Sequence, residues 1–125
     1  MKAKLKIYLC DCVYNYLGTG THMFPLNIGY IASYAKKFFH EKTDIKLFKY
    51  PADFIDQLKK HKPDIAGLSN YAWSADLNNQ LSGKVKTLYP DTIVVYGGPN
   101  INYTQDGYAA FFNGYESADF YITHE

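Results

Sequence analysis

The fold is indicated most clearly by the stretch Thr92-Ile93-Val94-Val95-Tyr96-Gly97-Gly98-Pro99-Asn100. Residues 92–96 are β-branched or aromatic throughout, which is typical of a strand. Two glycines, a proline and an asparagine follow at once, and these residue types favour a turn. The stretch therefore predicts a strand that runs directly into a loop.

Strands and helices alternate on both sides of this stretch. Apolar, β-rich runs predict further strands at residues 5–10, 45–50, 64–69 and 119–123. Apolar residues at helical spacing predict helices from Pro25 to about His40, from Pro51 to before Pro63, from a Ser74 cap to Tyr89, and near residues 105–112. This alternation predicts an α/β fold with three layers, a doubly wound parallel sheet of the flavodoxin-like or Rossmann-like kind, with strand order 2-1-3-4-5.

The end of the sequence suggests how the domain is bounded. A chain of 125 residues is long enough for one domain with its own core. A doubly wound sheet normally covers its last strand with a helix, yet only Thr123, His124 and Glu125 remain at that point. We therefore expect residues 1–125 to be one domain, excised from a larger protein, with the final helix missing.

Composition argues against several classes of partner. Hydrophobic residues make up 47% and charged residues 20%, as in ordinary globular domains. The net charge is +1 without a dense cluster of Lys or Arg, so nucleic acid is not an expected partner. No apolar run approaches the roughly 20 residues that cross a bilayer, and the first ten residues do not resemble a secretory signal. We expect a cytoplasmic protein without a membrane partner.

Cys10 and Cys12 are the two cysteines of the chain. Two thiols are too few for a complete zinc or iron–sulfur site. Their spacing places both side chains on one face of a strand end. We expect them to be small buried side chains rather than metal ligands.

A ligand is expected at the carboxyl ends of the strands, where the strand order reverses. The loops that meet there comprise residues 11–24, 70–73 and 97–102. Together they offer a glycine pair for close backbone approach, hydrogen-bonding amides and hydroxyls, and aromatic rings. The glycine pair can equally be an ordinary tight turn, so the residues alone leave both interpretations open.

Three segments, taken together, resemble the cobalamin-binding domain of B12-dependent radical SAM proteins, the group that includes the Mg-protoporphyrin IX monomethyl ester oxidative cyclases. In chain order they are Pro25-Leu26-Asn27-Ile28-Gly29-Tyr30-Ile31-Ala32, Ser69-Asn70-Tyr71-Ala72-Trp73 and Gly97-Gly98-Pro99-Asn100. The resemblance covers nearly the whole chain, and residues 119–122 resemble the segment that leads towards the radical SAM domain.

The resemblance implies a corrinoid over the carboxyl edge of the sheet, with its nucleotide tail beside the glycine pair. Gly97 and Gly98 would make room for the tail, and Leu26 and Ile28 would form the wall of the cavity. Tyr71 and Trp73 would pack on the corrin or shield the lower face of the cobalt. The implied cofactor-binding residues are Leu26, Ile28, Ser69, Asn70, Tyr71, Trp73, Gly97, Gly98, Pro99 and Asn100.

The cobalt ligand is expected to differ from that of the better-known cobalamin proteins. Their signature after the first strand is Asp-x-His-x-x-Gly, whereas Asp11-Cys12-Val13 has no histidine at that place. The resemblance therefore implies cobalamin bound without histidine below the cobalt (His-off). His22 lies in the same loop and is an alternative ligand, although a solvated loop histidine explains it equally well.

The radical chemistry of this family resides in a second domain. That domain carries a 4Fe-4S cluster on Cys-x-x-x-Cys-x-x-Cys and binds S-adenosylmethionine, and no such cysteine spacing occurs here. We therefore expect a non-catalytic module that positions cobalamin for a radical SAM domain of the same polypeptide, in methyl transfer or oxidative cyclisation.

Two other functions remain open from the residues alone. A free-standing flavodoxin-like protein would bind FMN or act as a signalling receiver, but Gly18-Thr19-Gly20-Thr21 fits a phosphate loop only loosely and Ser69-Asn70 occupies the place of the receiver's phosphoacceptor. A small catalytic domain would need a nucleophile, a base and an orienting group brought together, and the sequence suggests no such set.

Overall fold

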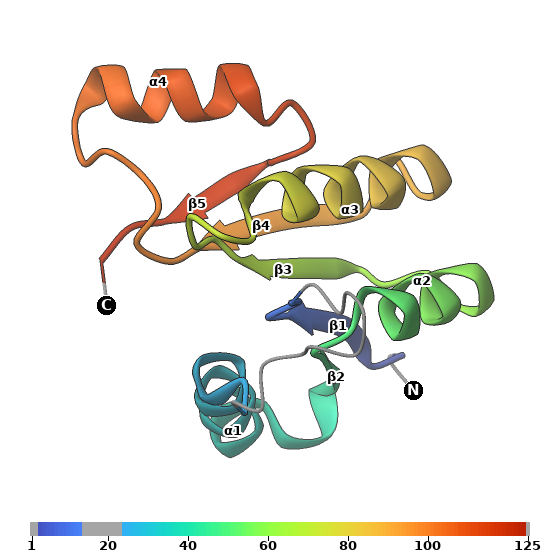
Figure 1. Ribbon diagram of the computed structural model, residues 1–125. Coiled ribbons are helices and arrows are strands. Elements are labelled where there is room, and N and C mark those ends of the chain that lie inside the picture. Colours follow the sequence, from blue (N-terminus) through green and yellow to red (C-terminus); the bar gives the residue numbers. More distant parts are fainter. Residues whose placement is uncertain (1–2, 14–23, 125) are drawn as a thin grey trace.

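The computed structural model describes residues 3–13 and 24–124, which fold around a parallel sheet (Figure 1). Its strands are β1 (Leu5–Cys10), β2 (Thr43–Phe48), β3 (Ile65–Ser69), β4 (Ile93–Gly97) and β5 (Phe120–Ile122). They lie in the order β2-β1-β3-β4-β5, and each neighbouring pair is parallel. The predicted fold class and strand order are confirmed.

Helices cover the sheet unequally on its two faces. One face carries α1 (Leu26–Phe39), which leads through a short 3-10 helix, η1 (His40–Lys42), into β2. The other face carries α2 (Pro51–Lys60), α3 (Ala75–Leu88) and α4 (Gln105–Gly114) (Figure 1). None of the helices in the described residues has the length and apolar character that a membrane span requires.

The ends of several elements differ from the predicted ones. β2 spans Thr43–Phe48 rather than residues 45–50, because Tyr50 already accepts the first hydrogen bond of α2, from the Phe54 N–H at 3.3 Å. Ser74 precedes α3 as predicted, but its hydroxyl does not cap the helix. It donates instead to the carbonyl of Ser69 at 3.2 Å and so holds the turn after β3.

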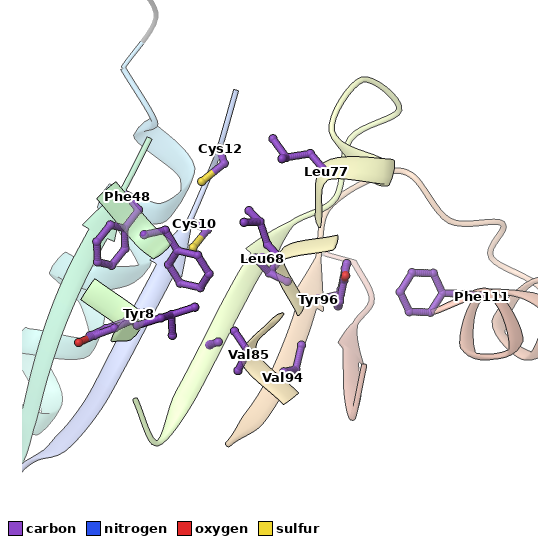
Figure 2. Packing of buried hydrophobic residues seen from close by; sticks show 14 residues of the cluster. Tyr8, Cys10, Cys12, Phe48, Leu68, Leu77, Val85, Val94, Tyr96 and Phe111 are labelled. Carbon is purple, nitrogen blue, oxygen red and sulfur yellow. The ribbon is translucent and has the colours of Figure 1, made fainter. Parts of the chain in front are cut away.

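The larger core lies between the sheet and α2, α3 and α4 (Figure 2). Tyr8, Phe48 and Phe54 form an aromatic group with ring centroids 5.1 to 6.3 Å apart. Cys10 and Cys12 are buried beside it as free thiols, as predicted. Burial is the main cause that raises the pKa of the Cys10 thiol well above its ordinary value, so this thiol stays protonated.

The smaller core lies under α1, where Ile28 and Ala32 pack on Leu9 of β1. On this face Leu9 is in register with Gly67, Gly67 with Val95, and Val95 with Phe120. Residues in register across parallel strands share a face, so this side of β3, β4 and β5 continues the surface that α1 covers. Phe120 and Ile122 of β5 are exposed there. Within residues 3–13 and 24–124, α1 is the helix of this face and it packs over β1 and β2.

Candidate functional site

Two of the three predicted loops lie together at the carboxyl edge of the sheet. The Asn70 N–H donates to the carbonyl of Gly97 at 2.6 Å, and the Asn100 N–H donates to the carbonyl of Asn70 at 3.2 Å. These bonds join the turn after β3 to the turn after β4. The predicted convergence of the aromatic pair and the glycine pair is therefore present, whereas residues 14–23 of the third loop lie outside the described part of the chain.

The two glycines of the pair have different surroundings. Gly98 has φ +114, and a Cβ there would lie 2.7 Å from the carbonyl oxygen of Asn70. Its glycine character is required by packing within the protein. A Cβ on Gly97 would meet nothing closer than the carbonyl oxygen of Ile122, at 3.9 Å. A side chain at Gly97 would therefore fit without a clash, and the role of this glycine beside a ligand stays a prediction.

Asn70 holds the rim of the site together from below. Its side chain is fully buried, and Nδ2 donates to the Asn100 carbonyl at 3.0 Å and to the Tyr121 hydroxyl at 3.4 Å. The Tyr121 hydroxyl donates in turn to the carbonyl of Gly98 at 2.5 Å. Burial raises the pKa of Tyr121, which keeps this donor protonated. Asn100 is half-buried and Pro99 is exposed, so these two residues form the outer rim.

Tyr71 and Trp73 form an aromatic plate at the same edge. Their rings are stacked, with centroids 4.7 Å apart and planes 3° apart. Trp73 is 67% exposed, so its outer face is available to a flat partner. A second stacked pair, Tyr103 and His124, has centroids 4.8 Å apart, and sequence reasoning missed it because its members lie 21 positions apart.

Asn27 was also missed, although it lies inside a segment that carried the resemblance. Its Nδ2 donates to Ser69 Oγ at 2.9 Å and to the Tyr71 hydroxyl at 3.3 Å. These bonds tie the start of α1 to the end of β3. Of its neighbours, Leu26 is exposed, whereas Ile28 is buried in the smaller core against Leu9 and Ala32. The structure thus places Leu26, and not Ile28, at the surface of the site.

The Ser69 carbonyl is held by two polar side chains from the turn and from α3. Asn78 Nδ2 donates to it at 2.6 Å, in addition to the bond from Ser74. Asn78 is fully buried, and its Oδ1 has no hydrogen-bond partner among the described residues. The position of Ser69 is therefore fixed from two directions, through its side chain by Asn27 and through its backbone by α3.

An acidic group lies near this edge, and two hollows lie elsewhere on the molecule. Asp11 follows β1, and burial raises the pKa of its carboxyl. Within the described residues no group of three or more His, Cys, Asp or Glu side chains is placed to hold a metal ion. His22 lies outside those residues. A hollow of about 660 Å³ lies beside β2 and α2, and one of about 450 Å³ beside α3 and α4, both lined mainly by polar and charged side chains.

Comparison with known proteins bears on the fold and on the family of the chain. A crystal structure of a cobalamin-binding protein from Desulfitobacterium hafniense DCB-2 is similar over 95% of this chain, with a TM-score of 0.62 and 20% sequence identity. The match covers 52% of that protein, so this chain spans about half its length, and at such identity the likeness concerns the fold. No curated protein matches the chain significantly. The family model of the B12 binding domain matches residues 17–117, which is most of the chain, and the chain therefore belongs to the B12-binding domain family.

Proposed function

We propose that this domain holds a corrinoid over the carboxyl edge of its sheet and presents the cobalt to a radical SAM domain of the same polypeptide. The observation that carries the proposal is the exposed plate of Trp73 on Tyr71. Beside it lie the Ser69 hydroxyl, the Asn100 carboxamide and the small residue Gly97. A corrinoid combines a flat macrocycle, amide side chains and a phosphate. The edge offers an apolar surface for the first and hydrogen-bonding groups for the others.

The residues at the edge divide into those that would touch the corrinoid and those that support them. Trp73 and Tyr71 would pack on the macrocycle, and Leu26 would extend the apolar wall. Gly97 would admit the nucleotide tail, and Ser69, Pro99 and Asn100 would form the polar rim. Asn70, Gly98 and Ile28 would act from beneath, since their contacts are with the protein itself.

The manner of cobalt binding is part of the proposal. Asp11-Cys12-Val13 offers no imidazole after β1, which supports binding without a histidine below the cobalt. The radical SAM domain would supply the 4Fe-4S cluster and S-adenosylmethionine, for methyl transfer or oxidative cyclisation, and residues 1–125 would be the N-terminal domain of that larger protein. A cytoplasmic location is consistent with free, unpaired Cys10 and Cys12.

Titration with hydroxocobalamin tests the proposal directly. Trp73 is the only tryptophan, so its fluorescence reports on this edge alone. We expect saturable quenching, and an absorption spectrum of the bound cofactor without imidazole coordination. By calorimetry, Trp73→Ala should weaken binding at least several-fold, whereas the matched control Phe112→Ala, on the exposed side of α4, should not.

The same titration with FMN distinguishes cobalamin binding from the main alternative, FMN binding. A domain that binds FMN but not hydroxocobalamin would be a flavodoxin-like protein, and the proposal would be wrong. Hydroxocobalamin binding that Trp73→Ala leaves unchanged would place the corrinoid elsewhere on the surface.

A further inference from the structure

The carboxamide of Asn27 has a fixed orientation. Its Oδ1 accepts a hydrogen bond from the Ile28 N–H at 2.7 Å, and this bond requires the oxygen on that side. The nitrogen therefore faces Ser69 Oγ at 2.9 Å and the Tyr71 hydroxyl at 3.3 Å. Because an amide nitrogen can only donate, both hydroxyl oxygens must act as acceptors from Asn27.

The consequence concerns the hydroxyl hydrogens. A hydroxyl that accepts from Asn27 directs its own hydrogen away from Asn27. Among the described residues, neither the Ser69 hydroxyl nor the Tyr71 hydroxyl donates a hydrogen bond to another group. Ser69 is only 8% exposed, so little water is available to satisfy this group. The hydroxyls of Ser69 and Tyr71 can therefore donate to a ligand at the carboxyl edge, beside the Trp73 plate.

We propose that Asn27 is a positioning residue that presents Ser69 and Tyr71 as a pair of hydrogen-bond donors to an acceptor on the bound corrinoid. The proposal rests on corrinoid binding at this edge. The acceptor is an oxygen or nitrogen lone pair, which the amide side chains of the macrocycle and the nucleotide tail both carry. Asn27 itself does not need to touch the ligand, because it acts through the two hydroxyls.

The decisive variant is Asn27→Asp, which keeps the shape of the side chain but reverses the direction of its hydrogen bonds to the two hydroxyls. A carboxylate still accepts from the Ile28 N–H, but it also accepts from both hydroxyls and so turns their hydrogens away from the ligand. We expect the dissociation constant for hydroxocobalamin to rise roughly tenfold or more, since two ligand hydrogen bonds are lost. The melting temperature without ligand should change little, because the bond from the Ile28 N–H is kept and the two bonds to the hydroxyls survive with their direction reversed.

Asn27→Ala serves as the matched comparison. It removes the tie between α1 and β3, so it should lower the melting temperature more than Asn27→Asp does. The two hydroxyls then remain free to rotate towards the ligand, so its effect on the dissociation constant should be smaller than that of Asn27→Asp. A purely structural role would give the opposite ranking of the two variants in affinity.

A mutant cycle shows whether Asn27 acts through the hydroxyls. In a Ser69→Ala, Tyr71→Phe background, Asn27→Asp should no longer change the dissociation constant. If its effect persists in that background, or if Asn27→Asp binds as tightly as the wild type, the proposal is overturned.

Cobinamide, which lacks the nucleotide, locates the acceptor. An effect of Asn27→Asp on cobinamide binding assigns the acceptor to the macrocycle amides, and an effect confined to hydroxocobalamin assigns it to the tail. A wild-type domain that binds neither corrinoid overturns both this inference and the proposed function. If the wild-type domain binds hydroxocobalamin and the Asn27→Asp variant binds it equally tightly, this inference alone is overturned.

Discussion

At the scale of single residues, the glycines show how much the sequence leaves undetermined. Gly98 and Gly29 are both part of segments that carried the family resemblance. A Cβ at Gly98 would collide with the backbone of Asn70, whereas a Cβ at Gly29, inside α1, would meet nothing within 4 Å. One glycine is therefore required by the fold, and the other is not.

Alanine substitution should separate the two. Gly98→Ala has to adopt φ +114 against the Asn70 carbonyl, so we expect a loss of roughly 1–3 kcal/mol in the free energy of unfolding. Gly29→Ala should raise that free energy by up to about 1 kcal/mol, because alanine favours helix over glycine. Urea unfolding of the domain without ligand measures both, and equal effects at the two positions would contradict the packing argument.

The candidate site residues could be predicted only where the residue types next to a strand end indicated a ligand-binding turn. The turn residues Tyr71, Trp73 and Gly97 could be named because strand ends in a parallel sheet meet at one edge. The bond from Asn27 to Ser69 could not, because it joins residues 42 positions apart and depends on the orientation of one carboxamide. Asn78 was missed for a different reason, since a polar residue on a helix is ordinarily expected to face solvent.

At the scale of elements, β4 and α3 are joined by a buried polar contact. The Tyr96 hydroxyl lies 2.8 Å from Ser82 Oγ, and both side chains are fully buried. Burial is the main cause that raises the pKa of Tyr96 well above its ordinary value. The pKa values of Tyr8, Tyr115 and Tyr121 are raised by burial as well.

These tyrosines predict a loss of stability in alkaline solution. Because their pKa values are higher in the folded state, the unfolded chain releases its phenolic protons first, from about pH 10. The free energy of unfolding should be unaffected by these groups below that pH and should fall as the pH rises above it. Urea unfolding between pH 8 and pH 11 measures the slope.

Tyr96→Phe should make that slope shallower, although it also removes the bond to Ser82. Tyr30→Phe, at an exposed position on α1, controls for the loss of one phenol. A slope that is the same in the wild type and in Tyr96→Phe would contradict the assignment.

The existence and order of the elements followed from the sequence, but their ends did not. Hydrophobic periodicity located each strand of the described residues, because apolar side chains must alternate or run continuously to cover a buried sheet. The end of β2 was placed two residues too late, since Lys49 and Tyr50 continue the β-rich pattern while the backbone already turns into α2. Such ends depend on competition between neighbouring elements, which a local pattern does not contain.

At the scale of the whole molecule, α2, α3 and α4 lie on one face of the sheet and α1 lies on the other (Figure 1). Phe120 is 59% exposed and Ile122 is 63% exposed, on the same face as the smaller core. Contiguous apolar surface of this kind favours association in water. The predicted three-layer fold is thus present, and over β3 to β5 no helix of the described residues completes the third layer.

Charged substitutions on this face should improve the behaviour of the isolated domain. We expect the double variant Phe120→Lys, Ile122→Lys to bind less of an environment-sensitive hydrophobic dye and to associate less as concentration rises, as measured by fluorescence and by sedimentation. Phe112→Lys, on α4, is the control for an added charge. Equal dye binding by all three proteins would show that the exposed apolar surface lies elsewhere.

Tyr121 connects this outer strand to the carboxyl edge of the sheet, because its hydroxyl donates to the Gly98 carbonyl and accepts a bond from Asn70. β5 has only three residues and borders the sheet, so its amide hydrogens should exchange with solvent faster than those of β1 or β3. A ligand that rigidifies the turn after β4 should slow this exchange in β5 without touching the strand. Deuterium uptake in residues 120–122, measured by mass spectrometry, should then be slower when a ligand occupies the site.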